Sequence, residues 1–101
     1  MKNSENISWI FLAVDLASQN SPAGIKEISQ VGDGINHAVP TSTELHESIK
    51  WLLNKNFILK VRSKYTLTEF GTKTISDSKN KSNQLFKIWE NIQKCIEGIL
   101  E

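Results

Sequence analysis

The chain has 101 residues, of which 39% are hydrophobic and 23% are charged, and its formal net charge at pH 7 is +1. These values are ordinary for a globular protein, so they exclude global disorder and predict one domain over residues 1–101. The single cysteine, Cys95, cannot form an internal disulfide, and neither it nor the histidines His37 and His46 share a metal-site spacing, so we expect no metal and no cofactor.

The N-terminal residues Met1 to Glu5 lack the charged stretch and the cleavage site of a signal peptide. The longest apolar stretch, residues 7–16, is too short to span a bilayer. We therefore expect a cytoplasmic protein without a membrane segment.

The charges are unevenly distributed along the chain. Residues 50–81 hold eight basic and two acidic residues, whereas residues 1–49 hold two basic and six acidic ones. Such a chain can present an acidic face and a basic face to different partners. Two solvated faces without any partner fit the same pattern.

A first helix is predicted over residues 4–19, with Ser4 as its N-cap. It carries so many apolar residues that we expect it at the centre of the fold. Ser21-Pro22 is typical of the start of a second helix, over 22–31, because proline suits the first helical position. Gly32-Asp33-Gly34 is expected to end that helix.

A third helix is predicted over residues 41–55. Thr41 and Glu44 have the spacing of a capping box, in which each side chain bonds the backbone N–H of the other residue. Asn56 is expected to end the helix in the left-handed conformation. The apolar face of the helix consists of Leu45, Ile49, Leu52 and Leu53.

Residues 57–67 predict a β-hairpin with a minimal turn at Arg62-Ser63-Lys64. A short helix over 68–77 follows, capped by Thr68, although Gly71 disfavours it, and 76–83 is expected to be an exposed connection.

The last predicted helix covers 83–100. Its apolar stripe, in which Cys95 is expected to fill the core, could pack on the first helix or pair with a second copy; its size favours a homodimer.

Two segments, Asn56-Phe57-Ile58 and Tyr65-Thr66-Leu67-Thr68-Glu69-Phe70-Gly71, resemble the pattern of multiple-antibiotic-resistance-type and PadR-type winged-helix regulators. In that family a "glycine-leucine-isoleucine" step follows the helix-turn-helix, and "Tyr-x-Leu-Thr-x-x-Gly" closes the wing. The resemblance covers about residues 8–75, with Asn56 in place of the glycine. It implies a mainly α winged helix-turn-helix with a small β-hairpin and an additional C-terminal helix.

In that family, the helix that corresponds to residues 41–55 of this chain enters the major groove of DNA. The resemblance thus implies a transcriptional regulator, with hairpin side chains on phosphates. Against this, Glu44 and Glu47 would repel DNA unless one of them contacts a cytosine amino group, and the hairpin is short. The residues implied in DNA binding are Thr41, Ser42, Thr43, His46 and Lys50 on the helix, and Lys60, Arg62 and Lys64 on the hairpin.

The chain has no Ser-His-Asp or Cys-His pairing and no phosphate-binding glycine loop, which predicts a protein that is not an enzyme. Its near-neutral charge and acidic first half slightly favour a protein partner over double-stranded DNA. Small proteins of this kind resemble the immunity proteins of bacterial contact-dependent growth inhibition, which suggests an immunity or antitoxin-type protein that neutralises a basic, nuclease-like toxin. The residues expected to bind such a partner are Asp33, Glu44, Glu47 and Trp51.

Overall fold

The computed structural model describes residues 3–100, which form a mainly helical fold with one small antiparallel hairpin, as the sequence predicts. None of its helices is long and apolar enough to cross a membrane. The elements are α1 (Asn3–Ala17), α2 (Ile25–Asn36), α3 (Ser42–Asn54), β1 (Ile58–Val61), β2 (Lys64–Leu67), α4 (Glu69–Asn80) and α5 (Leu85–Leu100).

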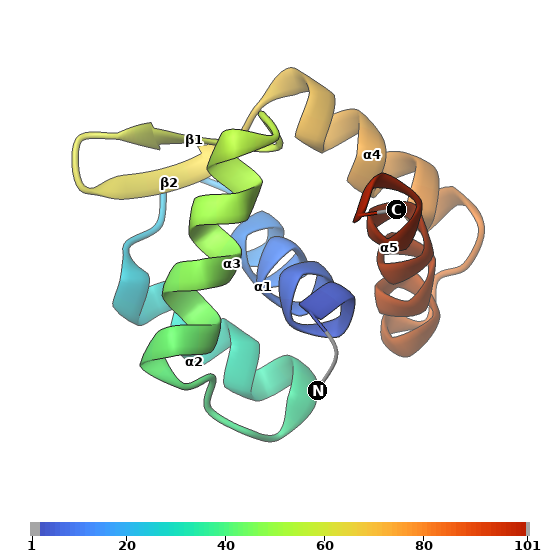
Figure 1. Cartoon of the computed structure of the whole chain (residues 1–101), viewed down its shortest axis with the longest axis horizontal. Coiled ribbons are helices and arrows are strands. Elements are labelled where there is room, and N and C mark those ends of the chain that lie inside the picture. Colours follow the sequence, from blue (N-terminus) through green and yellow to red (C-terminus); the bar gives the residue numbers. More distant parts are fainter. Residues whose placement is uncertain (1–2, 101) are drawn as a thin grey trace.

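Helix α1 lies at the centre of the fold, where α2, α3 and α5 pack around it (Figure 1). Its residues 9–14 are all buried, so the helix has no solvent-facing side along this stretch. Two tryptophans tie it to its neighbours: Trp9 Nε1 donates to Gly32 O of α2 (2.8 Å), and Trp89 Nε1 of α5 donates to Ser8 Oγ (2.9 Å). The prediction of a central first helix is confirmed, but Ser4 lies inside the helix and is not its N-cap, and the helix ends two residues earlier than expected.

Helix α2 differs from the prediction at both ends. It starts at Ile25 because Ala23, expected inside the helix, forms a β-bridge with Tyr65 through two backbone bonds of 2.8 Å. It then runs through Gly32-Asp33-Gly34 and ends only at His37, whose φ is 55°. Glycine weakens a helix by about 1 kcal/mol, but this helix buries Ile35 and bonds Trp9 through Gly32 O, which favour its continuation.

Helix α3 has the predicted capping box and the predicted C-terminal signal. Glu44 N–H donates to Thr41 Oγ1 (3.1 Å), and Thr41 N–H donates to Glu44 Oε1 (2.8 Å). Asn56, just beyond the helix, has a φ of 64°, so the left-handed conformation expected there is confirmed.

The hairpin pairs Ile58 with Leu67 and Val61 with Lys64, which leaves a two-residue turn at Arg62-Ser63. Lys64, expected in the turn, is instead the first residue of β2 because it pairs with Val61.

Phe57 and Gly71 form a close junction between α3, the hairpin and α4. The Phe57 N–H donates to Leu52 O of α3 (3.0 Å), and its carbonyl accepts from Thr68 N–H (3.1 Å). Thr68 Oγ1 accepts from Gly71 N–H (2.9 Å), which confirms Thr68 as the cap of α4. A Cβ built on Gly71 would lie 1.9 Å from Phe57 O, so the glycine that disfavoured the helix prediction is required by this contact.

The ends of α4 and the face of α5 correct the sequence analysis. Helix α4 extends to Asn80, through residues expected in an exposed connection, because Ser78 is buried and Lys79 pairs with Asp15 of α1 at 2.8 Å. Cys95 is exposed, so the prediction that it fills the core is wrong. The buried face of α5 follows i, i+4, i+8 spacing and consists of Ile88, Ile92 and Ile96.

That buried face packs on α1, which is the first of the two alternatives predicted for the apolar stripe of this helix. The homodimer remains a prediction; the apolar side chains of α5 left exposed lie at its two ends and include Leu85, Phe86, Ile99 and Leu100.

Replacement of Gly71 tests the junction. We expect Gly71→Ala to lower the free energy of unfolding by about 3 kcal/mol, because the added methyl group overlaps the Phe57 carbonyl. Gly34→Ala is the matched control, since nothing lies within 4 Å of its added Cβ. It should raise stability by about 0.5–1 kcal/mol through helix propensity. Equal effects of the two substitutions in chemical denaturation would contradict the junction.

Candidate functional site

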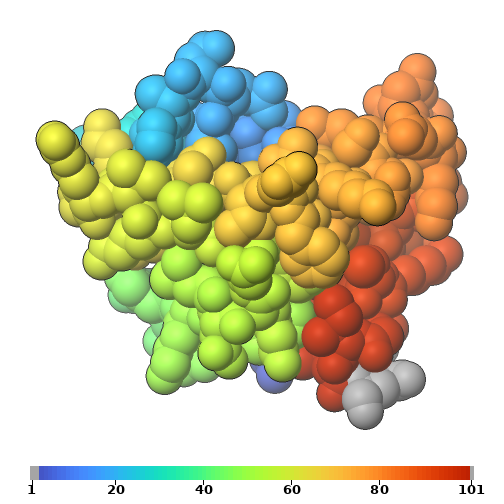
Figure 2. Space-filling model, turned by 90° about the horizontal axis from the view of Figure 1, so that it is seen from above, coloured from blue at the N-terminus to red at the C-terminus, as the bar shows by residue number. Residues whose placement is uncertain are grey.

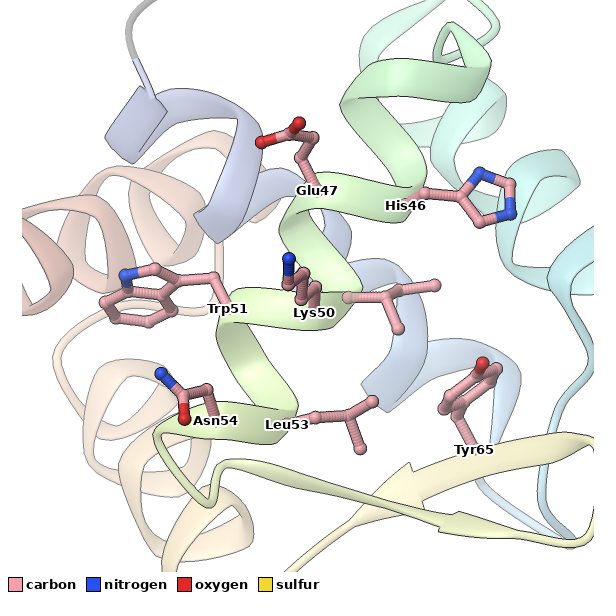
Figure 3. Close-up of a pocket in the computed structure, with 8 residues that line it drawn as sticks. His46, Glu47, Lys50, Trp51, Leu53, Asn54 and Tyr65 are labelled. Carbon is pink, nitrogen blue, oxygen red and sulfur yellow. The ribbon is translucent and has the colours of Figure 1, made fainter.

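The outer face of α3 exposes a histidine, an acidic residue and a basic residue, His46, Glu47 and Lys50. Leu45, Ile49 and Leu52 turn inwards at i, i+4 and i+7 spacing, so the opposite side of the helix faces solvent. Figure 3 shows the side chains that project from successive turns of this side and Tyr65, which approaches from β2. Together these elements border an open hollow, the α3–hairpin hollow, lined by His46, Glu47, Ile49, Lys50, Trp51, Leu53, Asn54 and Tyr65.

The ring of His46 is oriented by its own helix. Its Nδ1 lies 2.8 Å from Ser42 O, and a carbonyl only accepts, so Nδ1 carries the hydrogen of this bond. In the neutral ring, Nε2 is therefore an acceptor. Glu47 adds a second acceptor on the same face, and Lys50, three residues further along, adds a donor.

The hairpin beside α3 carries three exposed basic residues, Lys60, Arg62 and Lys64. Arg62 opens the two-residue turn with a φ of 61°, a conformation that usually selects glycine. Figure 2 shows the hairpin (yellow), α3 (green) and α4 (gold) side by side on one face of the molecule. The elements that hold most of the basic segment therefore lie together.

These basic side chains are available to a partner. Among the described residues, no salt bridge involves Lys50 or Lys55 of the α3 end, or Lys60, Arg62 and Lys64 of the hairpin. Lys55 Nζ lies 5.9 Å from the centre of the Trp51 ring, and Lys60 Nζ lies 6.0 Å from that of Tyr65.

The acidic residues of the first half do not gather in one place. Asp15 pairs with Lys79, and Glu27 Oε1 accepts from Gly24 N–H (3.1 Å) at the start of α2. Glu44 is held in the capping box of α3. Asp33 lies on α2, outside both hollows of α3, so the structure does not bring it near the other predicted protein-binding residues.

A second hollow, between α1, α3 and the end of α5, does combine the other three predicted protein-binding residues, Glu44, Glu47 and Trp51. The Trp51 ring is half-buried and stacks on Phe57, with 5.9 Å between ring centres and 14° between ring planes. Trp51 thus packs at the base of the hairpin and presents only part of its surface.

The residues predicted to bind DNA divide into two groups. Lys50, His46 and Thr43 are exposed on the outer face of α3, as expected. Thr41 and Ser42 are exposed as well, but each also bonds α3 itself, Thr41 as the N-cap and Ser42 through its backbone carbonyl.

Sequence reasoning missed Asn54 and Tyr65 in the α3–hairpin hollow. The spacing of Asn54 four residues after Lys50 could have found it, but no local signal predicts the approach of Tyr65.

No model of a protein family, no curated protein and no solved structure matches this chain.

The capping role of Thr41 gives a stability prediction. We expect Thr41→Ala to lower the free energy of unfolding by about 1 kcal/mol, because the Glu44 N–H at the start of α3 loses its acceptor, Thr41 Oγ1. Thr41→Ser should keep most of the stability. Thr43→Ala is the control on the same helix, since Thr43 is exposed and its side chain forms no hydrogen bond with the described residues. A loss from Thr43→Ala as large as that from Thr41→Ala, measured by urea denaturation, would contradict the capping role.

Proposed function

We propose that the protein binds double-stranded DNA as a winged helix-turn-helix module, with α3 in the major groove and the hairpin against the phosphates. One observation carries this proposal: α3, its C-terminal end and the hairpin that follows expose five basic residues that form no salt bridge among the described residues. They are Lys50, Lys55, Lys60, Arg62 and Lys64.

The arrangement of the elements supports the winged-helix assignment. The hairpin directly follows α3, as in the regulators that the sequence resembles, and Ala23 adds a single-residue strand beside β2. The two segments that carry the resemblance meet at the Phe57–Gly71 junction. That junction fixes the hairpin relative to α3, which a two-element DNA surface requires.

Electrostatics favour DNA over a basic protein partner. Three of the carboxylates that favoured a basic partner, Asp15, Glu27 and Glu44, bond their own fold. Glu47 is the one exposed carboxylate of α3, since Glu44 is partly buried, and β1 and β2 carry none. Between residues 42 and 67, the five lysine and arginine side chains therefore outnumber the exposed carboxylates, and they suit a polyanion.

Arg62 contributes to this surface at a cost in backbone strain. An L-residue in the left-handed conformation is disfavoured by about 1–2 kcal/mol. The turn nevertheless holds an arginine, whose guanidinium can bond two phosphate oxygens at once.

Binding to a duplex of random sequence tests the proposal. We expect binding to weaken with salt, and Lys60→Ala/Lys64→Ala to reduce the log–log salt slope by about 0.9 for each lost phosphate contact. Lys87→Ala/Lys94→Ala is the matched control: it removes two charges from α5, where both lysines lie near Glu90. Fluorescence anisotropy at several salt concentrations measures both. Undetectable binding at low salt, or equal effects of the two double variants, would contradict the proposal.

Arg62→Gly separates stability from binding. We expect a gain of about 0.5–1 kcal/mol in the free energy of unfolding, because glycine relieves the positive φ, together with weaker DNA binding. Ser63→Gly, at a turn position without positive φ, should bring neither the gain in stability nor the loss of affinity. A more stable Arg62→Gly variant with unchanged DNA affinity would exclude Arg62 from the interface.

The second candidate is a protein-binding module that neutralises a basic, nuclease-like toxin. The hollow that combines Glu44, Glu47 and Trp51 favours it. Under this proposal, Glu47→Lys abolishes complex formation with a purified basic nuclease domain, whereas Lys60→Ala/Lys64→Ala preserves it. Under the DNA proposal, Lys60→Ala/Lys64→Ala weakens binding to a duplex more than Glu47→Lys does.

A further inference from the structure

We propose that Glu47 reads a cytosine in the major groove, so that the bound sequence contains a C·G pair at a fixed position. This inference rests on the proposed DNA binding and deepens it. It starts from Glu47 as the one exposed carboxylate of α3 and the hairpin, whose other exposed charged residues are all basic.

Glu47 has no structural task within the described residues. It forms neither a salt bridge nor a side-chain hydrogen bond there, although Lys50 follows it by one turn of the helix. Glu44, by contrast, bonds the Thr41 N–H. The Glu47 carboxylate lies on the rim shared by both hollows, in the N-terminal half of α3. In helices that enter the major groove, this half meets the base edges.

A carboxylate at this place either opposes DNA or accepts a hydrogen bond from a base. Near a phosphate it would be repelled, and the exposed lysines and arginine of the hairpin provide the phosphate contacts instead. In the major groove, the cytosine N4 amino group is a donor that an aspartate or glutamate accepts. A glutamate on this face therefore weakens DNA binding unless it faces a base whose amino group donates a hydrogen bond to it.

The neighbours of Glu47 complete the pattern of a C·G pair. The pair presents one donor, cytosine N4, beside two acceptors, guanine O6 and N7. Glu47 offers an acceptor, and Lys50 offers a donor that suits guanine O6 and N7. His46 Nε2, oriented by the 2.8 Å bond of Nδ1 to Ser42 O, adds an acceptor for a further amino group.

The contact between Glu47 and a cytosine is tested by selecting the duplexes that the protein binds from a pool with a randomised centre. The wild type should enrich duplexes with a C·G pair at one position, and changing that pair to T·A should weaken binding about tenfold or more. Glu47→Gln should shift the preference at this position towards adenine, since a glutamine amide bonds adenine N6 and N7. Glu47→Ala should remove the preference there and tighten binding to random duplex, because a repelling charge is lost.

Asp33→Asn is the matched control, because it removes one exposed carboxylate from α2, outside both hollows. It should leave the base preference unchanged. A Glu47→Gln variant that selects the same sequences as the wild type overturns the reading while DNA binding stands. Failure of the wild type to bind any duplex overturns both the reading and the proposed function. A purely structural role for Glu47 would change stability without moving the preferred base.

Discussion

The contact between Gly71 and the carbonyl of Phe57 is the constraint on which the rest of this surface depends. The missing side chain of Gly71 lets α4 approach the backbone at the end of α3, where a Cβ would lie 1.9 Å from Phe57 O. The Phe57 ring then packs against Phe11 of α1, Trp51 of α3 and Phe70 of α4, with centres 5.1, 5.9 and 4.9 Å away. One residue thus joins α1, α3 and α4 at the point where the hairpin begins.

The acidic residues of the first half of the chain and the basic residues of α3 and the hairpin have different roles. Three of the six carboxylates of residues 1–49 serve the fold, two at the start of a helix and one as the partner of Lys79. The basic residues at the end of α3 and on the hairpin have no such duty among residues 3–100. A chain with a net charge of only +1 can therefore expose a basic surface, and the overall charge says little about what it binds.

The sequence predicts the parts of the fold that depend on local signals. The capping box of Thr41, the left-handed Asn56 and the cap at Thr68 are confirmed, because each needs only residues a few positions apart. Predictions fail where distant contacts decide. Gly32 stays helical because α1 packs against it, and α4 extends because Lys79 reaches Asp15.

The same limit applies to the site. Helical spacing identifies the outer face of α3, including His46, Glu47 and Lys50. The capping box likewise predicts that Glu44 bonds the start of its own helix. Helical spacing does not reveal that Tyr65 borders the hollow, because that depends on how the hairpin packs beside α3.

The most direct test of the central claim is a titration of the isotope-labelled protein with duplex DNA, followed through its backbone amide NMR signals. The account predicts that the signals of residues 43–50 and 60–64 shift together with rising DNA, while those of α5 stay in place. Shifts confined to α5, or no shifts at millimolar concentration and low salt, would contradict it and turn the search towards a protein partner.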